Sequence, residues 1–201
     1  MSRTVGCIVA LVAVLAIFGF ILVGQFNGLV GAEQTVEESW SQVQNVYQRR
    51  ADLVPNLVET VKGSAAFEQG TLTAVVEARS RVGQISQAAT QEILNDPQKF
   101  AQYQQAQDGL SSALSRLLVV VERYPELKST AAFSDLMTQL EGTENRITVE
   151  RKRFNEVARD FNSRLQKFPT NLFDRVLGWH FEPRPYFAAQ AGAETAPKVQ
   201  F

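Results

Sequence analysis

The chain has 201 residues, with 20 Lys or Arg against 21 Asp or Glu, and its formal net charge is −1. Because it carries no basic excess, its composition excludes the class of nucleic-acid-binding proteins. The single cysteine excludes an intramolecular disulfide, and the single histidine excludes a histidine-rich metal site.

The first predicted element is a membrane span from Val5 to Val23. Every residue in this run is apolar or glycine, and no charged residue stands between Arg3 and Glu33. A helix of about 19 such residues crosses the hydrocarbon core of a bilayer, which is about 30 Å thick. We therefore predict that residues 1–25 form an N-terminal transmembrane anchor whose partner is the lipid bilayer.

The flanking charges predict the orientation of this span. Arg3 and the α-amino group precede it, whereas Glu33 and Glu37 follow it. By the positive-inside rule, the first residues then lie in the cytoplasm and the rest of the chain lies on the outer, periplasmic side of the cytoplasmic membrane. The alternative is a signal peptide that is cleaved after Ala32, which the length of the apolar run opposes.

Small residues recur where the span leaves the membrane. Gly24, Gly28 and Ala32 stand at every fourth position, so that they share one helix face. Such a face lets two helices approach closely, and it is a candidate site of self-association. The alternative is that the glycines only loosen the helix at this point.

Prolines separate four predicted helices. The first continues from the span through Tyr47, with Trp40 on its apolar stripe. Asp52 is then predicted to cap a second helix with Pro55 in its first turn, where a missing amide N–H costs little. This second helix is predicted to run from about Leu53 to Ile93.

The last two predicted helices have clearer boundaries. Asp96 and Pro97 predict the cap and first turn of the third helix, which ends before Pro125. The fourth begins at about Ser129, and its apolar residues recur every seven positions, as they do along the seam of a supercoiled bundle. These residues are Phe133, Leu140, Ile147, Phe154, Phe161 and Phe168.

No segment alternates apolar and polar residues over the length of a strand, and short connections favour antiparallel neighbours. We therefore predict an all-α fold, in which the transmembrane helix continues into an elongated antiparallel four-helix bundle. This domain occupies residues 26–187.

Aromatic residues are dense in the segment that begins at about residue 169. We predict that this segment folds back over the bundle as a short helix and an extended strap. The alternative is that it docks on another subunit, on a partner or on the membrane interface, because Trp and Tyr suit interfacial regions. The candidate interaction residues are Phe173, Trp179, Phe181 and Tyr186. Residues 188–201 are small and polar, and we predict a disordered tail.

Charged residues interrupt the seam of the fourth helix at Glu144, Glu150 and Arg151. We predict an ionic layer that fixes the register of the bundle, in which Glu144 or Glu150 pairs with an arginine. The candidate arginines are Arg49, Arg50 and Arg79. The alternatives are a recognition groove for a partner helix and, more remotely, a catalytic site.

The residue types that carry chemistry are sparse. Cys7 lies in the apolar span, and His180 is the one histidine, which argues against a Cys–His nucleophilic pair. Carboxylates on helices with arginines nearby are far more often salt-bridged than catalytic. No glycine-rich loop of the kind that cradles phosphate is present. We therefore predict no catalytic residue, cofactor, metal or small-molecule substrate.

The run from Arg49 to Gly63 closely resembles the signature of the LemA family, a family of small bacterial membrane-anchored helical proteins. The resemblance extends from Asn27 to Phe187 and implies a helical domain attached to a membrane, without implying a reaction. Phe26 stands where the family commonly has tyrosine. The family-signature and structural positions are Asn27, Trp40, Arg49, Arg50, Asp52, Pro55, Asn56, Glu77, Arg79, Glu144, Asn145 and Arg151.

These features predict a non-enzymatic, membrane-tethered helical scaffold or adaptor at the bacterial cell envelope that associates with itself as a homo-oligomer. The alternative is an accessory or regulatory subunit of another envelope complex, such as a membrane protease or a transporter. A hydrolase is the remote alternative.

Overall fold

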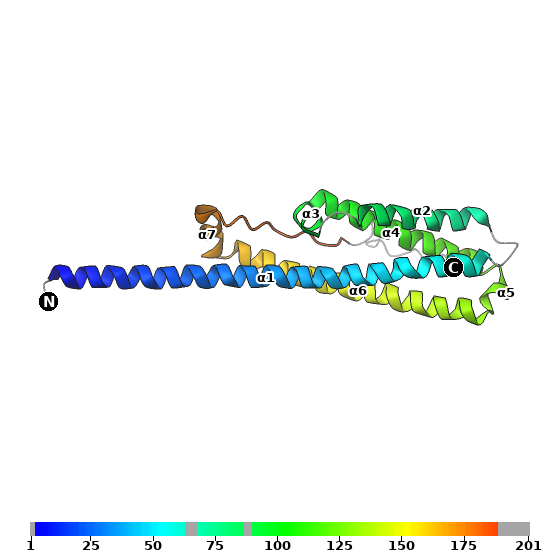
Figure 1. Cartoon of the computed structure of the whole chain (residues 1–201), viewed down its shortest axis with the longest axis horizontal. Helices are drawn as coiled ribbons and strands as arrows, with labels where there is room; N and C mark the ends of the chain where they lie inside the picture. The colour runs from blue at the N-terminus through cyan, green and yellow to red at the C-terminus, as the bar shows by residue number, and fades with distance from the viewer. Residues whose placement is uncertain (1–2, 63–67, 87–89, 189–201) are drawn as a thin grey trace, which may run out of the picture.

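The computed structural model describes residues 3–62, 68–86 and 90–188, and all regular secondary structure in these ranges is helical (Figure 1). The prediction of an all-α fold is therefore confirmed. The predicted disordered tail lies outside the described residues, apart from Ala188. The helices are α1 (Arg3–Lys62), α2 (Gln69–Ile85), α3 (Thr90–Asn95), α4 (Pro97–Val121), α5 (Pro125–Lys128), α6 (Ala131–Gln166) and α7 (Thr170–Leu177).

Helix α1 joins the apolar segment to the folded part of the chain without a break. It has 60 residues, which corresponds to a length of about 90 Å. Its amino-terminal part is long and apolar enough to cross a membrane, and none of the most apolar 18-residue stretch is buried within the chain. Figure 1 shows this part projecting beyond all the other helices.

The predicted bend at Asp52 is wrong, because α1 continues through it to Lys62 with Pro55 inside the helix. Asp52 does not cap a helix; its Oδ1 accepts a hydrogen bond from Gln48 Nε2 at 2.7 Å. A proline within a helix leaves the carbonyl four residues earlier without its N–H donor, here that of Ala51. Arg79 Nε donates to this oxygen at 3.0 Å and so replaces the missing donor.

The burial of the segment around Pro55, from Leu53 to Val61, also favours a continuous helix. Its apolar side chains belong to one buried cluster with residues of α2, α4 and α6, and a chain that turned away at Asp52 would expose them. The buried residues are Leu53, Val54, Leu57, Val58 and Val61. The predicted second helix from Leu53 to Ile93 is consequently divided among the end of α1, α2 and α3.

The start of α4 is formed as the sequence predicts. Asp96 Oδ1 accepts hydrogen bonds from the amide nitrogens of Gln98 and Lys99, at 2.8 and 3.3 Å, and Pro97 is the first residue of the helix. The helix ends at Val121, before Pro125.

The seven-residue repeat of α6 is buried from Phe133 to Phe161. Phe168 departs from it and is 80% exposed, because α6 ends at Gln166 and the helical phase no longer sets its direction. The repeat therefore predicts the core of the helix correctly and fails beyond its carboxyl end.

Successive long helices run in opposite directions along one axis, with α1 beside α6 and α2 beside α4 (Figure 1). Two buried clusters fill the space between them. The distal core includes Leu57, Leu72, Val75, Leu110, Leu117, Phe133 and Leu140. The proximal core, nearer the apolar end of α1, includes Leu29, Trp40, Tyr47, Phe100, Tyr103, Ile147, Phe154, Phe161 and Phe187.

After α6 the chain turns back through α7 and then continues as an extended segment from Gly178 to Ala188, which we call the strap. Figure 1 shows the strap running from α7 back along the bundle toward α4. Phe187 of the strap belongs to the proximal core, so this segment is part of the packed interior.

Candidate functional site

A polar layer lies between the two cores and is centred on Arg50 of α1, which is 1% exposed. Its Nη1 donates to Glu144 Oε1 of α6 at 3.0 Å and to the hydroxyl of Ser111 on α4. Its Nη2 donates to the backbone and side-chain oxygens of Gln107. We call Arg50, Gln107, Ser111 and Glu144 the Arg50 layer.

The Arg50 layer ties three helices together through one buried charge. Burying a guanidinium costs free energy unless its hydrogen bonds are made and a counter-charge lies close to it. Helices α4 and α6 supply these partners only when they are aligned with α1. Glu144 is 40% exposed, so this carboxylate also touches solvent. The layer therefore constrains the register of the helices.

The other charges proposed for an ionic layer lie elsewhere. Arg49 is exposed, and Arg79 donates to the Ala51 carbonyl of α1. Glu150 Oε2 is buried without a hydrogen-bond partner in the part of the chain that the structure describes. Of the predicted pairings, the structure forms the one between Arg50 and Glu144.

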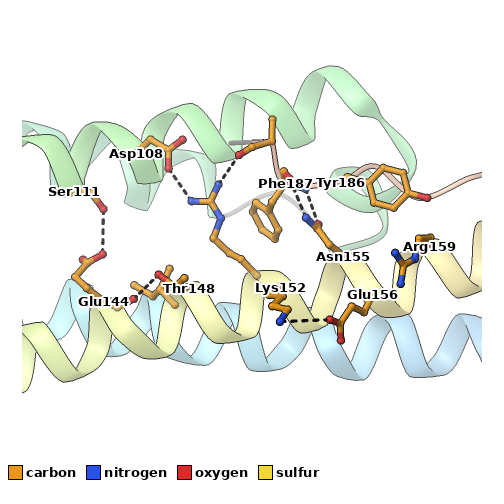
Figure 2. A pocket seen from close by; sticks show the side chains of 13 residues that line it. Asp108, Ser111, Glu144, Thr148, Lys152, Asn155, Glu156, Arg159, Tyr186 and Phe187 are labelled. Atoms are coloured by element: carbon orange, nitrogen blue, oxygen red, sulfur yellow. Dashed lines mark hydrogen bonds and ion pairs between the residues drawn. The ribbon is translucent and has the colours of Figure 1, made fainter. Parts of the chain in front are cut away.

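Beside this layer a groove of about 950 Å³ opens between α4, α6 and the strap (Figure 2). Arg151 crosses one side of it, with Nη1 2.9 Å from Asp108 Oδ1 and its guanidinium 4.6 Å from the centre of the Phe187 ring. The groove carries charges of both signs. The lining residues are Asp108, Ser111, Glu144, Ile147, Thr148, Arg151, Lys152, Asn155, Glu156, Arg159, Tyr186, Phe187 and Ala188.

Two asparagines of α6 hold the backbone of the strap. Asn155 Nδ2 donates to the Phe187 carbonyl at 2.9 Å, and its Oδ1 accepts from the Phe187 amide at 2.8 Å (Figure 2). Asn162 makes the same pair of bonds with the backbone of Arg184, at 2.8 and 2.7 Å. Since the two asparagines are seven residues apart, they lie on one seam of α6 and act in place of a neighbouring strand.

Contacts from α4 and α1 complete the attachment of the strap. Gln104 exchanges two hydrogen bonds with the backbone of Ala188, at 3.0 and 3.2 Å. The buried side chain of Arg184 forms an ion pair with Glu33 of α1 and lies 5.4 Å from the centre of the Phe161 ring. The strap is therefore bound by three helices.

Sequence reasoning assigned no role in strap binding to Asn155, Asn162, Gln104 or Arg184. A signal for two of them is present, because Phe154-Asn155 and Phe161-Asn162 repeat the dipeptide Phe-Asn at the heptad spacing. In each dipeptide a buried seam residue is followed by an amide side chain. Two such amides seven residues apart lie on one side of the helix, where they can bind the backbone of an extended segment. Gln104 carries no comparable signal.

The aromatic residues of the proximal core surround Trp40, which has no exposed surface. Its ring centre lies 5.2 Å from that of Tyr103, 5.6 Å from Phe100, 5.5 Å from Phe154 and 6.0 Å from Phe187. Burial raises the pKa of Tyr103 to about 12 and raises the pKa of the Tyr47 phenol as well. Both phenols are therefore neutral at pH 7 and act as packing groups.

The remaining predicted positions are spread over the molecule. Asn56 is exposed on α1, Asn145 lies beside Glu144 at a smaller groove of about 500 Å³, and Glu77 is exposed with Arg81 at 3.8 Å. Asn27, Gly28 and Ala32 line another groove, of about 460 Å³, against α6. Among the described residues, no three His, Cys, Asp or Glu side chains are grouped so that they could hold a metal ion.

The candidate interaction residues of the carboxyl-terminal segment pack toward the apolar half of α1. The Phe173 ring centre lies 5.8 Å from that of Phe18, and the Trp179 ring centre lies 5.3 Å from that of Phe26. Phe26, which replaces a common tyrosine, is also 5.8 Å from Phe181. Tyr186 accepts a hydrogen bond at its hydroxyl from Asn162 Nδ2 at 2.8 Å.

Comparisons with known proteins agree with the family resemblance. The chain is 28% identical over 200 residues to magnetosome protein MamQ 2 of Paramagnetospirillum magneticum, which covers 92% of this chain and 73% of that protein. It is 24% identical over 163 residues to protein LemA of Metamycoplasma hominis, covering 81% of this chain and 69% of the relative. A model of the LemA family matches residues 39–201. The chain therefore belongs to the LemA family.

Proposed function

We propose that the protein is a non-enzymatic, membrane-tethered helical scaffold or adaptor at the bacterial cell envelope. In this proposal α1 crosses the cytoplasmic membrane, and the long helices form an antiparallel four-helix bundle on the periplasmic side. The observation that carries it is the continuity of α1, which runs from the apolar segment to Lys62 as one helix. Such a helix transmits the position of the anchor to the bundle without an intervening flexible linker.

The use of the polar side chains supports a role without catalysis. Arg50 and Glu144 hold three helices in register, and Arg151 is paired with Asp108. Asn155 and Asn162 are satisfied by the backbone of the strap. These groups are engaged in structural contacts that a reacting substrate would have to break. One of the two relatives is named as a magnetosome protein, and neither name states a reaction.

Self-association is proposed to use the small-residue face of α1. A Cβ atom built on Gly24 or on Gly28 would meet no other atom within 4 Å, so these two positions are open, whereas Ala32 packs partly against the proximal core. Helices with small residues at every fourth position can approach closely in a membrane, because their backbones come into contact. A homo-oligomer joined through its anchors would present several bundles at one place.

The mass and composition of the full-length particle after gentle detergent extraction from its native membrane test the proposal. We expect a discrete multiple of 22.3 kDa with no other chain, measured by light scattering and native mass spectrometry. A single chain of 22.3 kDa would overturn self-association. A reproducible foreign subunit would instead favour the second candidate function.

The second candidate is an accessory or regulatory subunit of another envelope complex, and the groove between α4, α6 and the strap favours it. Lys152 at this groove is 80% exposed, and its pair with Glu156 spans 4.0 Å, so it is free to contact a partner. A photo-crosslinker at Thr148 would then join the protein to one foreign chain, and Lys152→Glu would reduce the yield. The same crosslinker at Val119, which is 65% exposed on α4, is the control.

A further inference from the structure

Helix α7 presents apolar side chains to the exterior although it belongs to the folded part of the chain. Leu172 is 47% exposed and Val176 is 69% exposed, whereas Phe173 is buried. Leu172, Phe173, Val176 and Leu177 fall within about 140° around the helix at 100° per residue. Asn171, Asp174 and Arg175 occupy the opposite side. The helix is thus amphipathic, and only part of its apolar face is covered by the chain.

The contacts of α7 place it at one level of α1. Thr170 Oγ1 donates to Oε1 of Gln25, the first polar residue after the apolar run of α1, at 3.2 Å. Phe173 meets Phe18 edge to face at 5.8 Å between ring centres. Phe18 precedes Gln25 by seven residues, or about 10 Å along the helix axis.

The exposed face of α7 is therefore continuous with the apolar surface of α1. Figure 1 shows α7 as the element nearest to the projecting amino-terminal part of α1. If this part crosses a bilayer, Gln25 lies at the boundary of the hydrocarbon core and Phe18 lies below it. The apolar side chains of α7 then lie at the depth at which interfacial helices bury their apolar faces, about 5–10 Å into the boundary.

We propose that α7 is an interfacial membrane helix, whose exposed apolar face inserts into the bilayer leaflet at which α1 emerges. The inserting residues are Leu172, Val176 and Leu177. This inference rests on the proposed membrane crossing of α1. It adds a second lipid contact, beside the axis of α1, which fixes the rotation and tilt of the bundle relative to the membrane.

Single-cysteine variants of the full chain test this insertion. Cys7→Ser removes the one native cysteine, and Val176→Cys then carries an NBD label in vesicles of phosphatidylcholine and phosphatidylglycerol. We expect blue-shifted emission that lipids with brominated acyl chains quench. Asn171→Cys, on the polar side of α7, is the matched control and is expected to be quenched less by lipid and more by aqueous iodide.

Two reference labels separate this inference from the proposed anchor. Leu15→Cys reports the apolar segment of α1, and Val149→Cys, at a 61% exposed position of α6, reports the bundle. Quenching by brominated lipid at Leu15 but not at Val176 would overturn the interfacial helix and leave the anchor intact. Absence of quenching at Leu15 would overturn the anchor and with it this inference. If the emission of the label at Val176 is blue-shifted but is not quenched by brominated lipid, the apolar face of α7 is covered by protein. This result would overturn the proposal.

Discussion

Trp40 contacts three of the elements that meet in the proximal core. Its indole packs against rings from α4, α6 and the strap, and it is fully buried. Trp40→Ala is expected to lower the free energy of unfolding by about 3–5 kcal/mol, because the substitution leaves a cavity that rigid neighbouring rings cannot fill. Urea unfolding of the full chain in detergent, followed by far-ultraviolet circular dichroism, measures the change.

The matched control removes an apolar side chain from the surface. Val149→Ala, at a 61% exposed position of α6, is expected to change the free energy of unfolding by less than about 0.5 kcal/mol. If Trp40→Ala had an equally small effect, the indole would not be part of the core, and Trp40 would become a candidate for binding a partner.

Arg79 and Pro55 act together on one carbonyl of α1, although they are far apart in the sequence. In Pro55→Ala the new amide N–H can bond to the Ala51 carbonyl, so the helix is expected to gain stability, by up to about 3 kcal/mol. Arg79→Met is expected to cost about 1 kcal/mol in the native chain and close to nothing in the Pro55→Ala chain. Urea unfolding of the four chains gives the coupling energy.

The control for this cycle is Arg81→Met on the same helix. Arg81 is 72% exposed in its pair with Glu77, 3.8 Å away, and does not contact α1 through that pair. We expect its coupling to Pro55 to be zero within error. Strictly additive effects of Pro55→Ala and Arg79→Met would show that Arg79 does not substitute for the missing donor.

The strap depends on the amide side chains of α6. In a chain with Asn155→Ala and Asn162→Ala, the backbone amides of Arg184 and Phe187 lose their acceptors. We expect amide hydrogen exchange in residues 184–188 to become at least roughly tenfold faster, because each lost hydrogen bond contributes about 1 kcal/mol and the variant loses more than one. Asn145→Ala, at an exposed position of α6, is the control and is expected to leave this exchange unchanged.

Features that depend on residues close together in the sequence were predicted correctly, whereas a feature that depends on a contact between helices was not. The Asp96 cap and the buried repeat from Phe133 to Phe161 depend on neighbours within one helix, and the sequence predicted both. Helix α1 passes through Pro55 because Arg79, on another helix, satisfies Ala51. Local helix propensity cannot predict such a contact, so the predicted helix boundary at Asp52 was wrong.

The Arg50 layer also depends on contacts between helices that are far apart in the sequence. Composition and heptad position indicated an arginine–glutamate layer, but they left Arg49, Arg50 and Arg79 open, because they do not show which arginine packs against α6. Packing selects Arg50, which points between α4 and α6, and leaves Arg49 exposed. The groove arises from tertiary packing, whereas the path of the strap has a sequence signal in the repeated Phe-Asn dipeptide of α6.

The molecule as a whole is a rod in which the apolar segment, the cores and the strap are connected through α1. Glu33 of α1 pairs with Arg184, and Arg50 of α1 joins the layer between the cores. The strap and the other long helices are therefore both fixed to the helix that carries the apolar segment.

The small-residue face of α1 is proposed to join such rods into an assembly. Gly24→Leu with Gly28→Leu should leave the fold unchanged, because a Cβ atom at either position meets nothing within 4 Å and leucine favours a helix by about 0.8 kcal/mol per residue over glycine. If rods associate through this face, light scattering of the detergent-extracted variant should give the mass of one chain. Gly142→Leu, at an equally open position of α6, should keep the mass of the native particle. A native mass for the Gly24 and Gly28 variant would exclude this face from the assembly, because two leucines would prevent the close approach that it requires.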